Sequence, residues 1–555
     1  MTWALEPPAE PPPASNRGTL PLHSSLAAFR ATDSMDPRDL LPREQAKGKS
    51  HAKSLMYPQE WAVRVLPADV TMQLFEFATK GCPADCGKPW SREAIEAARA
   101  AGPHISAMDP DNVSLIWEDL EYQQSAGFAR IVPEKELFSG VVPEELKISR
   151  VAVVPQAERR GRIILNLSAP VEIPATRRSK KRKVIQKSVN ETTADARQQA
   201  AVRALGTALP ALLAFMFDTD SEWEIDWHKI DLSDGFWRMI VEHGKEYNFV
   251  YQLPRREGDT ETHYVVPSSL QMGWKNSPAY FCYATEAGRT LIQRTLAITL
   301  DSGIDQPHRH EEHCKPADAP QQGAAQWICP ADLRVIARVF VDDYINGVAG
   351  PPKRLRRNEE LQWVARATLH SVHSIFPPPE VIEHTDGKDS ISEKKLQKGD
   401  GRFDRSAVAL GIQLSGNPGR GRTVAIPASK LDRYLARLNN ALNRPHNYVT
   451  LPHFQELHGK LQYCGCFLPH LRGFMAPLNR ALSEGRRNIG LGKDSDVREA
   501  LTGMIGYLRL AYAIPSHITE LVPPRLPGVY GSVDAAAVGL GGTWLPATRE
   551  LPAIV

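Results

Sequence analysis

The sequence predicts a mixed α+β fold, and two patterns support that expectation. Short runs of β-branched and aromatic residues occur at 148–171 and 338–345, as is typical of strands. Apolar residues recur at helical spacing at 56–105 and again after residue 425. A chain of 555 residues is too long for a single core, so we expect several domains.

Composition excludes several classes of protein. Lys and Arg total 67 against 64 Asp and Glu, so any nucleic-acid binding must come from local patches. The N-terminus has no basic and apolar signal pattern, and the longest apolar run, 208–217, is half of a membrane span, so no membrane partner is expected. Seven cysteines fit a reducing compartment, and we expect an intracellular protein of the cytoplasm or nucleus.

The first part of the chain carries little visible chemistry. Residues 1–55 are Pro-rich and polar, which predicts a disordered leader, and 56–134 is predicted to be a helical N-terminal region. Cys82 and Cys86 have a spacing that zinc sites use, but no second pair follows them.

A strongly basic zone lies at 158–183, with nine basic residues against two acidic ones. It begins with a predicted basic turn at 159–162 and ends in a run of Arg and Lys at 177–183. One interpretation is a solvated loop or a nuclear-localisation signal. The other is a surface that faces nucleic-acid phosphates.

Later segments have recognisable patterns. Residues 196–217 are predicted to be a helix, and 301–330 is a polar, irregular insertion. Within the insertion, zinc binding is an alternative for His308, His310, His313 and Cys314. Two further helices are predicted after residue 425, with apolar faces formed by Leu431, Leu435, Leu438, Leu442 and by Phe454, Leu457, Leu461, Phe467. Two strands joined by a turn are expected at 529–534 and 540–544.

Three segments carry candidate chemistry. The first, FVDD at 340–343, places two aspartates in an apolar strand-like run, which suits either a hairpin turn or divalent-metal binding. The second, DLSDGF at 231–236, puts Asp231 at a strand end, where it could share two metal ions with the first pair. The third, QMGWKNSPA at 271–279, fits a helix start close to phosphates, or a loop into a core helix.

In this order, the three segments resemble motifs A, B and C of the reverse transcriptases of retroviruses and long-terminal-repeat-type retrotransposons. RIILNLS at 162–168 resembles the fingers strand, LGIQ at 410–413 the primer grip, and LHGKLQ at 457–462 with LRG at 471–473 the thumb. The resemblance covers about 135–485. Residues 534–544 resemble the first hairpin of a ribonuclease H domain, whose remaining carboxylates are not expected before Val555.

The resemblance implies a right-hand polymerase with fingers at 135–224, a palm at 225–424 and a helical thumb at 425–485. A fingers segment at 241–268 and the insertion at 301–330 would interrupt the palm. Residues 486–555 would be a connection and an incomplete ribonuclease H-like start, without nuclease activity. The implied activity is that of a retrotransposon Pol-type RNA-directed DNA polymerase, with dNTPs and an RNA or DNA template with primer as partners.

The resemblance also implies roles for individual residues. Two Mg²⁺ ions, or Mn²⁺ in their place, would be held by Asp231, Asp342, Asp343 and the carbonyl of Leu232. Substrate would be bound by Arg162, Phe236, Gly273, Trp274 and Lys275, and the primer grip would comprise Leu410 and Gly411. Arg162 would meet the triphosphate, Phe236 would exclude ribonucleotides, and Gly273 and Trp274 would border the template and the nascent base pair.

Three departures from the family pattern stand out. Met272 replaces the glutamine of many retroviral enzymes, and Phe340 replaces the motif C tyrosine. The motif D lysine is ambiguous among Lys394, Lys395 and Lys398. The rival interpretation is a catalytically lapsed retroelement remnant that only binds nucleic acid.

Overall fold

The computed structural model describes residues 54–156, 159–173, 183–297, 306–315, 333–354, 356–382, 388–522, 529–536 and 539–546. The chain divides into two compact units, Met1–Ser50 and His51–Val555, and the following paragraphs concern the second. The predicted leader, apart from its last two residues, lies outside the described residues.

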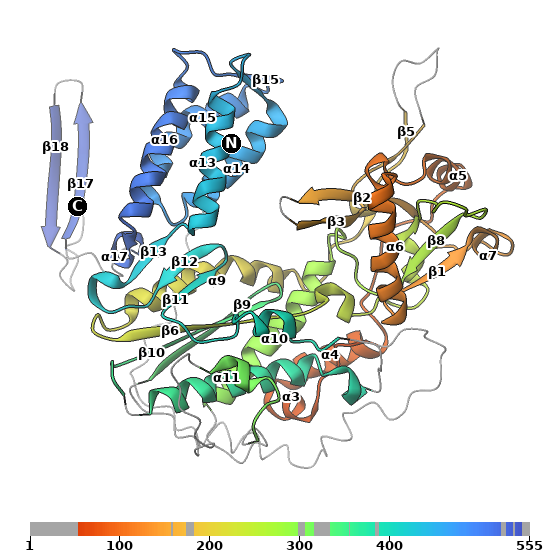
Figure 1. Ribbon diagram of the computed structural model, residues 1–555, viewed down its shortest axis with the longest axis horizontal. Helices are drawn as coiled ribbons and strands as arrows, with labels where there is room; N and C mark the ends of the chain where they lie inside the picture. The colour runs from red at the N-terminus through yellow and green to blue at the C-terminus, as the bar shows by residue number, and fades with distance from the viewer. Residues whose placement is uncertain are drawn as a thin grey trace, which may run out of the picture. The chain divides into compact units, whose positions relative to one another are not determined.

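A three-stranded antiparallel sheet lies at the centre of this unit. Its order is β6 (Glu224–Asp231), β10 (Asp343–Gly350) and β9 (Arg334–Phe340). Helix α10 (Ser277–Ala297) packs against β9 and against α11 (Arg357–Ile375) (Figure 1). The inner residues of β10 are buried without alternation, as is typical of a strand covered on both faces.

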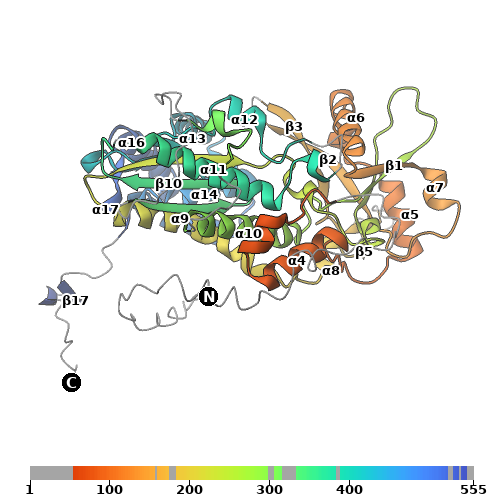
Figure 2. The same ribbon diagram turned by 90° about the horizontal axis from the view of Figure 1, so that it is seen from below.

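Helix α9 (Gln199–Asp218) runs along the same sheet and contacts β9 and α10 (Figure 2). Among the helices in the described part of the chain, it alone is long and apolar enough to cross a membrane, by length and composition only. The apolar run at 208–217, which by itself is too short for a membrane span, forms the second half of this helix. Of its apolar window 28% is buried, and Leu212, Phe215 and Met216 belong to a hydrophobic cluster that also contains Trp227 of β6 and Ile336 of β9.

A second, five-stranded sheet joins segments from both sides of β6. Its order is β1 (Ala129–Pro133), β8 (His263–Pro267), β7 (Val250–Gln252), β2 (Ile148–Gln156) and β3 (Arg159–Asn166). Segment 241–268 therefore contributes β7 and β8 to the sheet that holds β1–β3. The predicted basic turn at 159–162 is wrong, because these residues pair with β2 as the start of β3.

Helices dominate the N-terminal region, as predicted, although it ends in β1. They are α3 (Glu60–Val65), α4 (Ala68–Thr79), α5 (Arg92–Ala101) and α6 (Pro110–Ser125), followed by the short α7 (Glu134–Phe138). Before α9 come β4 (Val171–Ile173), β5 (Lys183–Gln186) and α8 (Val189–Thr192).

The two helices predicted after residue 425 are confirmed, except that the second ends at Cys464, before Phe467. They are α13 (Ala428–Leu442) and α14 (Leu451–Cys464), followed by α15 (Met475–Ser483) and α16 (Asp496–Ala513). Leu431 and Leu438 are buried because they lie on one face of α13, against α16 (Figure 1). Helix α16 extends this helical group past residue 485, where the sequence resemblance placed its end.

Smaller elements complete the unit. A four-stranded sheet has the order β11 (Ser406–Ala409), β12 (Ile412–Ser415), β13 (Thr423–Ala425) and β16 (Ser516–His517). The other elements are α12 (Glu393–Gln397), α17 (Ile518–Leu521) and the pair β14 (Tyr448–Thr450) and β15 (Asn488–Gly490). The strand pair expected near the end is confirmed as β17 (Val529–Ala536) and β18 (Gly539–Pro546).

The insertion between α10 and β9 is not wholly irregular. Residues 306–315 are described and contain a 3₁₀ turn, Glu311–Cys314, that contacts α11. Glu311 forms a buried ion pair with Arg366 at 2.8 Å, and its side chain is 3% exposed. His308 and His310 lie in irregular and turn backbone, as expected of the insertion, but both side chains are buried.

Candidate active site

The β9–β10 connection is a two-residue hairpin turn formed by Val341 and Asp342. Phe340 and Asp343 are register partners, so the hairpin turn, one of the two alternatives for FVDD, is confirmed, and metal binding at the same residues stays a prediction. Val341 has φ +60, a left-handed conformation that is an outlier for a β-branched residue. Strain of this kind, of order 1–3 kcal/mol, concentrates at functional sites.

The end of β6 brings a third carboxylate to this turn. Asp231 lies directly opposite Asp343 in the β6–β10 register, and the Leu232 amide donates to the Asp342 carbonyl at 3.0 Å. Like charges directly opposite each other on paired strands are destabilising. The sheet therefore holds two carboxylates opposite each other at a cost in stability, with Asp342 in the adjoining turn.

Two lysines partly neutralise this charge. Lys229 Nζ lies 3.0 Å from Asp343 Oδ1, and Lys395 of α12 forms an ion pair with Asp231. The structure thus selects Lys395 from the three motif D candidates as the lysine at the carboxylates. Lys229 was not singled out from sequence, although its position two residues before Asp231 puts it on the same strand face.

Two of the three carboxyl groups, those of Asp231 and Asp342, have raised pKa values. Burial, followed by a hydrogen bond shared with Asp343, raises the pKa of Asp231 to about 6. Burial, with the neighbouring Asp231 charge, raises the pKa of Asp342. Burial is the larger cause of both shifts and the nearby carboxyl group adds to it, so each group is harder to ionise than a carboxyl in water.

The donor set fits Mg²⁺. This ion prefers hard oxygen ligands and commonly takes one or two protein carboxylates together with substrate phosphates. Asp231, Asp342 and Asp343 offer such oxygens at one strand end, and a divalent ion would offset the repulsion between them.

A cavity of about 950 Å³ opens beside Asp343. Its wall includes Leu410 and Gly411, which form the two-residue turn between β11 and β12, and the side chains of Lys430 and Tyr463. Tyr463 donates a hydrogen bond to the Leu410 carbonyl, and burial lowers the pKa of Lys430. The structure therefore brings the predicted primer-grip residues to the same cavity as one of the predicted catalytic aspartates.

Gly411 suits this turn because its φ is +71, in the left-handed region. A Cβ there would meet only the end of the flexible Lys430 side chain, so the backbone conformation is the main reason for glycine. Glycine is the residue that adopts this conformation without steric cost.

Phe236 follows Asp231 in a 3₁₀ turn, Gly235–Arg238. Its ring is half-buried and makes an edge contact with Phe281 of α10, with the ring centroids 5.1 Å apart. The ring is thus supported from one side by the core.

The 271–279 segment is both a loop and the start of a core helix, because α10 begins at Ser277. Gly273 is exposed with φ +102, and a Cβ there would lie 2.8 Å from the Leu165 carbonyl of β3. Lys275 is exposed and pairs with Asp195 at 2.9 Å. Trp274 is 1% exposed and packs on Phe249, so its ring does not reach a surface where a base pair could lie.

Arg162 lines a different cavity from the one beside Asp343. Its guanidinium lies 2.6 Å from the sulfur of Met272, in a separate pocket of about 230 Å³ beside α6. Met272, which stands where many retroviral enzymes have glutamine, is therefore in direct contact with Arg162. Most of the basic run at 177–183 lies outside the described residues.

Comparisons with known proteins give limited information. No protein-family model and no curated protein matches the chain. Among solved structures, it is similar to a foamy viral protease-reverse transcriptase dRH bound to double-stranded DNA (TM-score 0.42, 13% identity, 90% of this chain and 67% of that one). It is similar also to the foamy viral protease-reverse transcriptase with double-stranded DNA (0.42, 14%, 92% and 72%) and with an RNA/DNA hybrid (0.42, 14%, 88% and 43%). Likeness at this level carries no inference here, and the residues themselves define an α+β protein with a carboxylate site beside a cavity.

Proposed function

We propose that this chain is an RNA-directed DNA polymerase that extends a primer with dNTPs, of the retrotransposon Pol type. The observation that carries the proposal is the convergence of Asp231, Asp342 and Asp343 at one strand end, beside a cavity lined by Leu410 and Gly411. Asp231 belongs to the segment that resembles motif A, Asp342 and Asp343 to motif C, and Leu410 and Gly411 to the primer grip. These segments follow one another in the order expected of such enzymes.

Each group has a proposed task. Asp231, Asp342 and Asp343, with the Leu232 carbonyl, would hold two Mg²⁺ ions. When bound, these ions supply charge stabilisation for the attacking and leaving oxygens of an in-line phosphoryl transfer. Lys395 would lie beside the reacting phosphates, and Phe236 would border the sugar. The protein would act by positioning and charge stabilisation, without covalent chemistry.

A primer-extension assay on poly(rA)/oligo(dT) with dTTP tests the proposal. We expect extension by the natural chain and its loss in Asp342→Asn. Removing a metal-binding carboxylate should cost several kcal/mol, or about 10²–10⁴-fold in rate. Asp69→Asn, an exposed change in α4, is the matched control and should extend normally.

The rival function, a nucleic-acid-binding remnant, predicts a different outcome. The natural chain would then bind primer–template, measured by fluorescence anisotropy, but would add no nucleotide. Near-normal extension by Asp342→Asn would also contradict the assignment of the site.

A further inference from the structure

A second cluster of potential metal ligands lies away from the three carboxylates. His308 and His310 from the insertion meet His370 and His373 of α11. The His308 ring centroid is 4.6–5.5 Å from those of the other three histidines. His308, His310 and His373 are at most 9% exposed.

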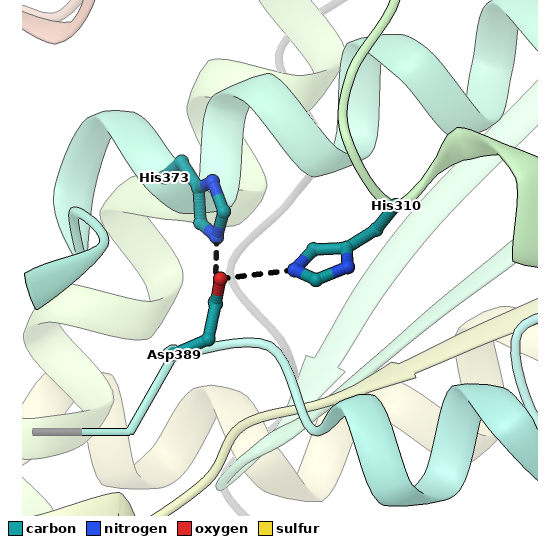
Figure 3. A group of neighbouring side chains, drawn as sticks. All are labelled: His310, His373 and Asp389. Atoms are coloured by element: carbon teal, nitrogen blue, oxygen red, sulfur yellow. Dashed lines mark hydrogen bonds and ion pairs between the residues drawn. The ribbon is translucent and has the colours of Figure 1, made fainter.

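Asp389 is the centre of this cluster (Figure 3). Its Oδ2 lies 2.9 Å from His310 Nε2, and its Oδ1 lies 2.9 Å from His373 Nε2. All three ligand atoms fall within 4.8 Å of one another. The three residues come from three separate segments of the chain, so only the folded state brings them together.

We propose that His310, His373 and Asp389 bind one Zn²⁺ ion that fastens the 306–315 segment to α11. Imidazole nitrogens and a carboxylate oxygen are a donor set that zinc uses, at about 2.0–2.2 Å from the ion. Ligand atoms around a tetrahedral ion are then roughly 3.3 Å apart. The two 2.9 Å contacts to Asp389 would open by a few tenths of an ångström, and the wider separations in the group, which lie within 4.8 Å, would close toward that value. Water would complete the coordination.

The surroundings fit a bound ion. Metal-binding histidines usually hold their second ring nitrogen in a hydrogen bond, and His373 Nδ1 lies 2.9 Å from His308 Nε2. Asp389 is further oriented by the Ile391 amide, which donates to Oδ1 at 2.8 Å. Arg309 also pairs with Oδ2, but it is 41% exposed and pairs with Glu380 as well, so it can yield Oδ2 to a metal.

The competing explanation is a hydrogen-bonded network without metal. In it His308 donates to His373, and both His373 and His310 donate to Asp389. Zinc binding reverses the first of these bonds and gives up the long contact, 3.2 Å, from the His310 amide to His308 Nδ1. Metal content separates the two explanations.

Zinc at this point would also brace the candidate active site, a consequence that rests on the proposed function. The Ser233 amide donates to the Ser390 carbonyl at 2.8 Å, and the Ser392 amide donates to the Asp231 carbonyl at 3.0 Å. Asp389 therefore begins the segment that carries Lys395 to Asp231.

The test is the zinc content of the full chain, produced without a histidine tag in zinc-supplemented medium and dialysed against metal-free buffer. We expect about one zinc per chain by mass spectrometry, and less than about a fifth of that in His310→Ala, His373→Ala and Asp389→Ala. His313→Ala is the matched control, since His313 lies in the same turn but outside the ligand group, and it should keep its zinc.

A second measurement on the natural chain avoids variants that fail to fold. A zinc-selective chelator should lower Tm by about 5 °C or more. X-ray absorption at the zinc edge should show nitrogen and oxygen ligands without the nearby Cys314 sulfur. A folded chain that retains less than about a tenth of an equivalent after incubation with excess zinc would overturn the proposal and leave the hydrogen-bonded network.

Failure of this proposal differs from failure of the proposed function. If a chain without zinc extends a primer, only the zinc proposal is refuted. If a chain that holds one zinc extends no primer, only the proposed polymerase function is refuted.

Discussion

Lys395 is the residue whose placement adds most to the sequence resemblance. Its ammonium group contacts Asp231, whereas Lys394 and Lys398 make no such contact within the described part of the chain. We expect Lys395→Ala to lower kcat about 10²–10⁴-fold, as for loss of a positioned proton donor. Lys394→Ala and Lys398→Ala are the controls, with near-normal kcat in single-turnover extension. Equal losses in all three variants would indicate a general charge effect instead.

The ring of Phe236 is predicted to favour deoxyribonucleotides over ribonucleotides. Its support by Phe281 means that the ring cannot retreat freely from a ribose 2′-hydroxyl, and overpacking of this kind costs about 1–3 kcal/mol. Phe236→Val should therefore lower the ratio of kcat/KM for dATP over rATP by about 5- to 150-fold, while dATP use persists.

Phe281→Leu is the matched control for that ratio. Phe281 is fully buried, so its substitution should lower stability while leaving a smaller effect on sugar discrimination. An unchanged ratio in Phe236→Val would make Phe236 a core residue only.

At the scale of elements, the insertion is fastened to α11 by the buried ion pair of Glu311 and Arg366. Removing one partner of a buried pair leaves an uncompensated charge, so Arg366→Ala should lower the free energy of unfolding by about 3–5 kcal/mol in urea denaturation. The ion pair of Glu312, which is 75% exposed, and the partly buried Lys315 is the control, and Lys315→Ala should cost less than about 1 kcal/mol. Comparable losses would mean that the insertion is not held by this pair.

The elements with strong local signals were predictable. The face of Leu431 and Leu438 predicted α13, and the two aspartates within an apolar run gave the β9–β10 turn as one of two alternatives. The role of the Trp274 ring was not predictable, because its burial against Phe249 depends on a strand far along the chain. A motif fixes the residue type, but packing decides which way the side chain points.

The histidine cluster shows the same limit more sharply. His308, His310, His313 and Cys314 were grouped as zinc ligands because they are close in sequence. The structure retains only His310 from that set and adds His373 and Asp389, the latter 79 residues from His310. Long-range convergence of this kind leaves no periodic signal in a single sequence.

At the scale of the whole molecule, a net charge of +3 makes nucleic-acid binding a question of where the charge lies. If the basic zone at 158–183 contacts phosphates, its neutralisation should release fewer counterions on binding. Replacing Arg177, Arg178, Lys180 and Lys181 by Ala should weaken primer–template binding and reduce the slope of log affinity against log salt by about 0.7–0.9 per lost contact. The control replaces Arg64, Lys80, Arg92 and Arg480, which are all more than half exposed, and so lowers the net charge equally. If the salt dependence weakens in the first variant and not in the control, the phosphate contacts lie in the basic zone. If the two variants have the same slope, the basic zone is a solvated loop or a localisation signal.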